Sequence, residues 1–331
     1  MLEIINITDF QLENGSVRKQ INLSYQVFGQ QIGVSPVVLV NHALTGNSNV
    51  CGENGWWNQI IGINKVIDTA IYTVIIFNIP GNGFDGDARN LEFDYKQFVA
   101  KDIANLFWKG LSHLGINQLF VAIGGSLGGG IAWEMAALQP NRIQHLIPIA
   151  TDWKATDWVI GNVLIQDQLL NNSNNPVADA RLHAMLLYRT PKSINQKFNR
   201  EIDAATTAFR IENWLFHHSL NLKNRFTLPA YKLMNHLLKT IDITRKSHDL
   251  EFEINKISAT IHLVSVDSDL LFTAEEIQNT FNKLKEMKSN IFHYQINSIH
   301  GHDAFLIENE QLTHILKPIF QNNNNLNYVN I

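Results

Sequence analysis

A serine flanked by glycines is the strongest candidate for chemistry in this sequence. Residues 124–128 read Gly-Gly-Ser-Leu-Gly, after the β-rich run 118–123 and before a helical pattern that begins at Leu127. A strand that turns this sharply into a helix strains its serine, and glycines on either side let strand and helix approach each other. The pattern predicts that Ser126 is a nucleophile. Alone it is weak evidence, because it should occur by chance in about one chain in ten of this length.

A serine nucleophile needs a base and an acid, and the chain has candidates for both in the required order. A serine hydroxyl reacts at neutral pH when a neutral imidazole takes its proton and a carboxylate orients that imidazole. Asp267 and Asp269 follow one late apolar run, and His300 and His302 follow the next. Both aspartates remain candidates for the acid. We favour His302 as the base, because Gly301 frees the turn before it and a helical pattern follows it.

The attacked carbonyl oxygen becomes negative in the transition state and needs two N–H donors, the oxyanion hole. One donor is expected to be the backbone N–H of Leu127, directly after the nucleophile. The other is expected in the loop after the strand at 37–41, which reads Asn-His-Ala-Leu-Thr-Gly-Asn over 41–47. In that loop we predict Leu44 as the donor.

These residues require a sheet of mostly parallel strands to hold them. Continuous apolar runs, typical of strands buried on both faces, alternate with helical patterns, which predicts a doubly wound α/β fold. The strands are expected at 37–41, 72–79, 119–125, 145–150, 259–266 and 290–296, and the helices at 95–115, 127–139 and 303–320. Alternating apolar and polar residues around Asn14-Gly15 predict an antiparallel hairpin at one edge.

A long helical segment interrupts the alternation of strands and helices. Helical patterns dominate residues 152–256, between two core strands. Such an insertion predicts a cap above the carboxyl edge of the sheet, where open α/β folds bind ligands. We therefore expect a core made of 1–151 and 257–331, with the cap inserted after the sixth core strand. The asparagine-rich tail after this core is expected to fray.

Composition excludes several other classes of protein. The chain has 331 residues, 45% of them hydrophobic, and can bury a large core. Its net charge of −4 offers no basic excess for nucleic acid or an anionic membrane. Cys51 is the only cysteine, and the sequence shows neither a secretory signal nor a membrane-spanning run, so we expect a soluble cytoplasmic protein. The 13 histidines show no metal-ligand spacing with acidic partners, and no metal is expected.

Five motifs spread over the chain resemble those of the homoserine O-acetyltransferase family, which belongs to the α/β-hydrolase-fold homoserine O-acyltransferases. They are HALTG at 42–46, GWW at 55–57 with the following IIG and DT, GGSLGG at 124–129, DSDLLF at 267–272 and GHDAFL at 301–306. The resemblance implies a catalytic triad of Ser126, Asp269 and His302. Its S-D-x-L-F pattern is what selects Asp269 over Asp267.

The resemblance also implies a site for the amino-acid acceptor. Residues 178–189, ADARLHAMLLYR, are similar to a family helix whose arginine, and a tyrosine seven residues later, contact the acceptor; they correspond to Arg181 and Tyr188. Seven residues are two helical turns, so both side chains share one face. The carboxylate that binds the acceptor amine falls on Asp303. Arg181 could then hold an α-carboxylate and Asp303 an α-ammonium.

The activity that the resemblance implies is transfer of an acetyl group from acetyl-CoA to the hydroxyl of L-homoserine, through a seryl acyl-enzyme, in methionine biosynthesis. Acetyl-CoA would be a co-substrate, with no permanently bound cofactor, and the kinetics would be ping-pong. Family members are typically homodimers through the cap. Succinyl-CoA as donor, or L-serine as acceptor, would use the same chemistry.

One segment departs from the family pattern. Family members usually carry a longer glycine- and cysteine-rich loop after the strand at 72–79, whereas this chain has the short PGNGFDGDARN at 80–90. The difference leaves two other functions open: a serine hydrolase, such as an esterase or thioesterase, and a non-catalytic binding protein. A hydrolase would need no amino-acid site, so Arg181 and Asp303 argue against it.

Overall fold

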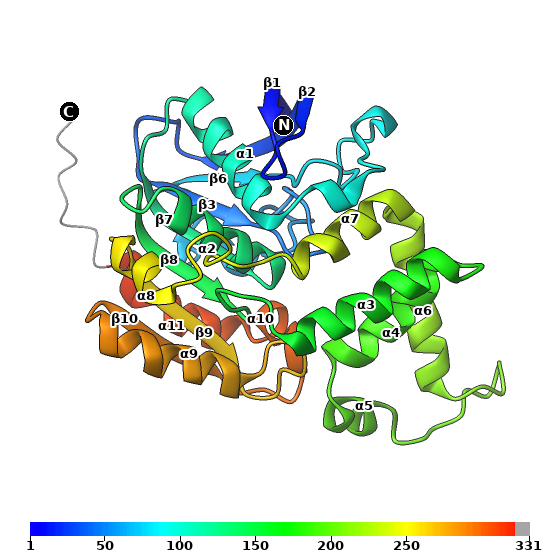
Figure 1. Ribbon diagram of the computed structural model, residues 1–331. Helices are drawn as coiled ribbons and strands as arrows, with labels where there is room; N and C mark the ends of the chain where they lie inside the picture. Colours follow the sequence, from blue (N-terminus) through cyan, green and yellow to red (C-terminus); the bar gives the residue numbers. More distant parts are fainter. Residues whose placement is uncertain (322–331) are drawn as a thin grey trace.

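The computed structural model describes residues 1–321 and is built around one large sheet (Figure 1). Eight strands lie in the order β1-β2-β6-β3-β7-β8-β9-β10. From β6 to β10 every neighbouring pair is parallel. The strands are β1 (Glu3–Gln11), β2 (Val17–Gly29), β3 (Val37–Asn41), β6 (Thr73–Phe77), β7 (Leu119–Gly125), β8 (Ile143–Ile149), β9 (Thr260–Val266) and β10 (Ile291–Ile296). A separate pair consists of β4 (Ile61–Gly62) and β5 (Ile67–Asp68).

The predicted edge hairpin is confirmed. β1 pairs antiparallel with β2, and Gln11 lies opposite Val17. Asn14 closes the turn by accepting the Ser16 N–H at 2.8 Å, and Gly15 takes a φ of 88° that suits glycine.

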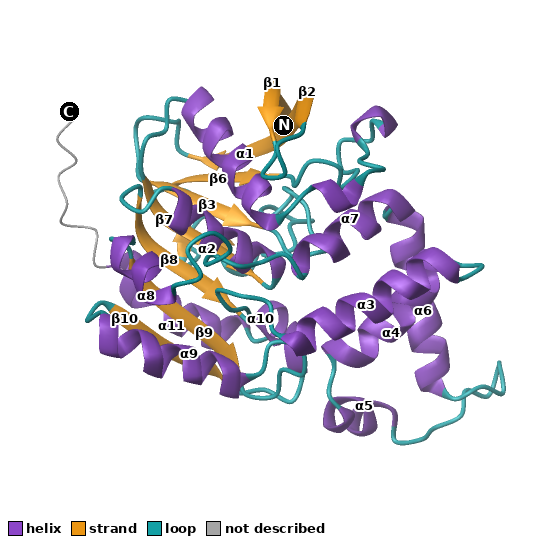
Figure 2. Ribbon diagram, viewed as in Figure 1, coloured by secondary structure: helices purple, strands orange, loops and turns teal. Residues whose placement is uncertain are grey.

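Helices cover both faces of the sheet, as Figure 2 shows. Alternate strand residues enter two separate apolar clusters, so that Leu39 packs on one face while Val38 and Val40 pack on the other. On the first face lie α1 (Ala100–His113), α2 (Leu127–Leu138), α8 (Leu250–Lys256) and α9 (Ala274–Met287). On the second lie α11 (Asn309–Gln321) and the chain around Trp57. The doubly wound α/β prediction is confirmed.

A group of helices lies between β8, the sixth strand of the large sheet along the chain, and β9. It contains α3 (Asp157–Asn172), α4 (Pro176–Tyr188), α5 (Pro191–Phe198), α6 (Arg210–Arg225) and α7 (Leu228–Leu238). Thr156, Thr190 and Thr227 cap three of them, and prolines stand in the first turns of α4, α5 and α7. In Figure 1, α3, α4 and α6 lie together beside the core, and we call α3–α7 the cap helices. The later α8 packs on α2 and α9 instead.

Two predicted helices have different limits in the structure. The helix expected at 95–115 begins at Ala100, because the Asp102 carboxylate accepts the Val99 N–H and ends the preceding turn η2 (Tyr95–Gln97). The helix expected at 303–320 is divided into η3 (Gly301–Asp303), α10 (Ala304–Ile307) and α11. A further short turn, η1 (Ala88–Asn90), lies in the loop after β6. The predicted fraying tail falls mostly outside the described residues, and no helix within 1–321 is long and apolar enough to cross a membrane.

Candidate active site

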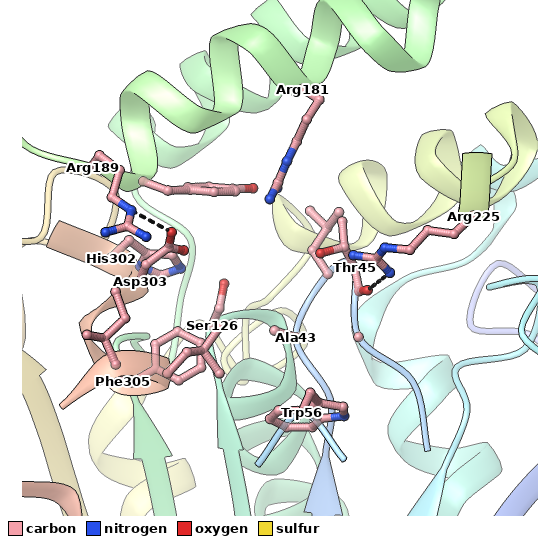
Figure 3. A pocket seen from close by; sticks show the side chains of 15 residues that line it. Ala43, Thr45, Trp56, Ser126, Arg181, Arg189, Arg225, His302, Asp303 and Phe305 are labelled. Atoms are coloured by element: carbon pink, nitrogen blue, oxygen red, sulfur yellow. Dashed lines mark hydrogen bonds and ion pairs between the residues drawn. The ribbon is translucent and has the colours of Figure 1, made fainter. Parts of the chain in front are cut away.

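Ser126 occupies a strained turn between β7 and α2. Its φ of 55° and ψ of −126° are rare for a residue with a side chain. A Cβ at Gly124 would lie 2.5 Å from the carbonyl carbon of Gly128, and a Cβ at Gly128 would collide with the carbonyl of Asn41. The glycines therefore let β7, α2 and β3 meet at this point, as the sequence pattern predicts. Figure 3 shows the Ser126 side chain pointing into a cavity.

His302 and Asp269 form a buried pair beside this serine. The His302 Nδ1 lies 2.6 Å from the Asp269 Oδ2, and each residue is less than 5% exposed. The other oxygen, Oδ1, accepts the backbone N–H groups of Leu271 and Phe272. Burial alone would lower the pKa of His302, but the charge and hydrogen bond of Asp269 outweigh it, so this pKa is raised.

The second ring nitrogen of His302 takes no part in the pair with Asp269. Its Nε2 is buried and has no hydrogen-bond partner within residues 1–321. Both residues line one cavity of about 290 Å³. With Nδ1 bound to Asp269, Nε2 is the nitrogen free to accept a proton.

The alternatives that the sequence left open lie in other contacts. Asp267 accepts the Ser298 N–H at 2.9 Å, and His300 contacts the Ser193 hydroxyl at 2.9 Å. Neither is paired with His302. The geometry thus favours Asp269 over Asp267 and His302 over His300.

Two backbone N–H groups, those of Leu127 and Leu44, are the candidates for the oxyanion hole. Leu127 begins α2 directly after Ser126, and Leu44 lies in the loop after β3 that lines the cavity. Within the described chain, neither N–H donates to another protein group. Because the loop rests on Gly128, these two predicted donors come from adjoining segments.

The cap helices add cationic side chains to the cavity. Arg181 and Tyr188 both line it from α4, with the guanidinium carbon 5.8 Å from the tyrosine ring centroid. They share one helical face, as their spacing predicts. The Arg181 Nε is buried without a partner among residues 1–321, and Figure 3 shows the side chain extending down from α4. Burial raises the pKa of Tyr188 to about 12, so its phenol stays protonated.

Two further arginines line the cavity and were not predicted. The Arg189 Nε bonds the Asp303 Oδ2 at 3.0 Å, and an Arg225 Nη bonds the Thr45 carbonyl at 3.0 Å (Figure 3). Asp303, predicted to bind an ammonium group, therefore shares its carboxylate with Arg189. Arg189 is the last residue of the motif that contains Arg181 and Tyr188, so the motif could have been used to predict that Arg189 lines the cavity. Arg225 belongs to α6 and to no recognised motif.

Comparisons with known proteins show the family of this chain. The family model described as alpha/beta hydrolase fold matches residues 36–176. Homoserine O-acetyltransferase from Cyclobacterium marinum is 30% identical, over 95% of this chain and 93% of its own. The enzyme of that name from Methanococcus vannielii is also 30% identical, over 92% of this chain and 69% of its own. This chain belongs to the homoserine O-acetyltransferase family.

Solved structures extend the likeness to the fold of nearly the whole chain. The homoserine O-acetyltransferase of Bacillus anthracis superimposes with a TM-score of 0.86 and 17% identity, covering 97% of both chains. The L374D mutant of esterase E22 gives the same TM-score at 19% identity, covering 97% of this chain and 100% of its own. The scaffold is thus shared with esterases, whereas the sequence similarity is to homoserine O-acetyltransferases. As a member of that family, this chain is an O-acyltransferase on an α/β-hydrolase scaffold.

Proposed function

We propose that this enzyme transfers an acetyl group from acetyl-CoA to the side-chain hydroxyl of L-homoserine, a step of methionine biosynthesis, in the cytoplasm. The observation that carries the proposal is that one cavity is lined by Ser126, His302, Arg181 and Asp303. The first two can perform acyl transfer. The other two have the charges that an α-amino acid requires at its carboxylate and ammonium groups.

In the first half-reaction His302 Nε2 takes the Ser126 proton while Oγ attacks the thioester carbonyl. The N–H groups of Leu44 and Leu127 stabilise the oxyanion, the C–S bond breaks, and the proton on Nε2 leaves with the CoA thiolate. In the second half-reaction Nε2 takes the homoserine hydroxyl proton, and that oxygen attacks the acyl-enzyme. The bond between the acyl carbon and Ser126 Oγ breaks, and Oγ regains its proton from His302. CoA leaves before homoserine attacks the acyl-enzyme, so the kinetics are ping-pong.

The acceptor fits the charges of the cavity. Arg181 uses none of its N–H groups within the described chain, so it can hold the α-carboxylate with two of them. Arg189 donates a hydrogen bond to Oδ2 of Asp303, which leaves Oδ1 to accept one from the α-ammonium. Holding both groups presents the side-chain hydroxyl at a fixed distance from Ser126.

The overall reaction is tested by following CoA release and product formation with acetyl-CoA, in the presence and absence of L-homoserine. Release of CoA that requires homoserine and yields O-acetylhomoserine supports the proposal. Continued turnover of acetyl-CoA without an acceptor supports a thioesterase, whereas release of a single CoA per enzyme marks the acyl-enzyme of the ping-pong mechanism. No release from either acetyl-CoA or succinyl-CoA supports a binding protein. Parallel reactions with succinyl-CoA and with L-serine determine the donor and acceptor.

The acceptor site is tested by Arg181→Ala. Removing the contact to the acceptor carboxylate should raise the KM for homoserine by roughly 10- to 100-fold, since a hydrogen bond to a charged group contributes about 1.5–3 kcal/mol. The KM for acetyl-CoA should change far less. Arg210→Ala is the matched control, because Arg210 pairs with Glu201 outside the cavity. Equal increases in both KM values would contradict the assignment.

We also propose that the enzyme is a homodimer that associates through the cap helices. Large apolar side chains remain exposed there, including Trp158 (53%), Leu164 (54%), Phe216 (56%) and Leu220 (50%). Phe216 and Leu220 are four residues apart on α6 and form one ridge. Light scattering after gel filtration should give twice the mass of the chain, and Phe216→Glu should lower it to one chain.

A further inference from the structure

His42 is a buried histidine beside the loop that carries Leu44. It directly follows β3, is only 1% exposed, and the mechanism above does not use it. Its ring contacts two backbone groups: Nε2 lies 3.0 Å from the Ile79 nitrogen, and Nδ1 lies 2.8 Å from the Ala43 carbonyl oxygen.

These two contacts determine which nitrogen carries the ring proton. A backbone N–H can only donate, so Nε2 must accept the hydrogen bond from Ile79. The proton of the neutral ring is then on Nδ1, which donates to the Ala43 carbonyl. Burial lowers the pKa of His42 to about 4, so the neutral ring persists at neutral pH.

The Ala43 carbonyl is part of the peptide unit that contains the Leu44 N–H. In a planar trans peptide the C=O and N–H point in opposite directions. The carbonyl is held by His42 and also accepts the Gly46 N–H at 2.8 Å. Fixing the carbonyl therefore fixes the N–H of Leu44, a residue that lines the cavity with Ser126.

We propose that His42 is a positioning residue: its Nδ1–H holds the Ala43–Leu44 peptide and thereby directs the Leu44 N–H toward the oxyanion. The inference rests on the proposed role of Ser126 as the nucleophile. His42 acts through Leu44 and touches no reacting atom.

The short loop after β6 supports His42 from the other side. The Asn82 amide nitrogen lies 3.4 Å from Nε2 and 3.3 Å from the Asn78 Oδ1. Asn78 also accepts the Ser48 N–H at 2.8 Å and donates to the Ser48 hydroxyl at 3.0 Å. Ser48 follows Leu44 along the chain by four residues. A buried hydrogen-bonded network therefore connects the 78–82 segment to both ends of the loop that carries Leu44.

Two amide variants separate the contacts of His42. In His42→Asn the side-chain NH₂ replaces Nδ1–H, so the bond to the Ala43 carbonyl can be kept while that to Ile79 is lost. In His42→Gln the side-chain oxygen replaces Nε2, so the bond to Ile79 can be kept while that to Ala43 is lost. The probe is p-nitrophenyl acetate, and the readout is the rate at which Ser126 is acetylated, followed by nitrophenol release and intact mass.

We expect His42→Asn to remain within about fivefold of the wild-type rate and His42→Gln to fall about 10- to 100-fold, because an oxyanion donor contributes roughly 10²–10³ in rate. The loss should lie in kcat, with KM for the ester nearly unchanged. Equal rates in the two variants, or a faster His42→Gln, overturn the inference. Absence of acetyl-Ser126 in the wild type contradicts the proposed function instead.

A second measurement is made on the wild-type enzyme and uses a variant only for assignment. Nitrogen-15 NMR of the wild-type enzyme with labelled histidine, with His42 assigned by its missing signal in His42→Asn, reports the protonated nitrogen. We expect a neutral ring with the proton on Nδ1 between pH 6 and pH 9. A charged ring, or a proton on Nε2, overturns the inference.

Discussion

At the scale of single residues, two aspartates that stand two positions apart have different partners. Asp269 bonds the His302 ring, whereas Asp267 bonds the backbone of Ser298. Asp269→Asn should therefore lower kcat by about 10⁴, because the amide favours the wrong ring tautomer. Asp267→Asn keeps an oxygen for the Ser298 N–H and should stay within several-fold of wild type. CoA release measures both, and loss of activity in Asp267→Asn alone would reverse the assignment.

The pairing of His302 with Asp269 also sets the pH dependence of acylation. His302 can accept the serine proton only when its ring is neutral, so kcat/KM should rise with pH through its pKa. That pKa is raised above the ordinary value of 6.5, so the acidic limb of the profile should have its midpoint above pH 6.5. In Asp269→Asn, burial is left to lower the pKa, and the midpoint of the residual activity should move to lower pH. An unchanged midpoint would mean that another group limits the rate.

Ser126 was predictable because glycines stand on both sides of it. The ends of two late apolar runs narrowed the acid to Asp267 or Asp269 and the base to His300 or His302. The choice of Asp269 came from the family motif, and that of His302 from the glycine before it. Arg225 was not predictable in this way. It reaches the cavity because α6 packs on α4, a contact between distant segments that no local pattern encodes.

At the scale of elements, the strained turn at Ser126, which we call the elbow, depends on backbones that meet without side chains between them. Gly128→Ala would place a Cβ against the Asn41 carbonyl and should lower the free energy of unfolding by roughly 1–3 kcal/mol, with loss of activity. Gly161→Ala is the matched control, because Gly161 lies within α3 and a Cβ there meets nothing within 4 Å. That change should raise the free energy of unfolding by about 0.5–1 kcal/mol. Urea denaturation measures both, and equal effects would contradict this explanation.

The core strands were predictable from the sequence, since runs such as 37–41 and 119–125 are apolar at every position. The break in the last helix was not. Residues 307–309 read Ile-Glu-Asn and contain neither glycine nor proline, so nothing local marks the end of α10. The break follows from tertiary contacts: Trp57 donates to the Phe305 carbonyl across 248 residues of sequence.

At the scale of the whole molecule, the stability of the fold should depend on a buried carboxyl group that does not line the cavity. Asp152 accepts the Thr280 hydroxyl at 2.8 Å, and burial raises the pKa of its carboxyl to about 7. Between about pH 4 and pH 7, the carboxyl group of Asp152 is therefore protonated in the folded state and ionised in the unfolded state. This group therefore stabilises the fold most at low pH, and its contribution declines as the pH rises through 7.

Asp152→Asn removes this titration and tests its sign. The difference in thermal midpoint, variant minus wild type, should be larger at pH 8 than at pH 5. The reason is that only the wild type must bury a charge at pH 8. The exposed Glu286→Gln is the control and should show no such change. A relative midpoint that is the same at both pH values would exclude Asp152 as a source of the pH dependence.

The parts of the proposed triad are far apart along the chain, with the serine at 126 and the histidine at 302. A ribosome that has synthesised two thirds of the polypeptide has already completed the elbow, but the imidazole has not yet been incorporated. Under the proposed mechanism, nascent or prematurely terminated chains cannot consume thioester. Catalysis begins only when the last segment folds back beside β9, which links the onset of turnover to completion of the fold.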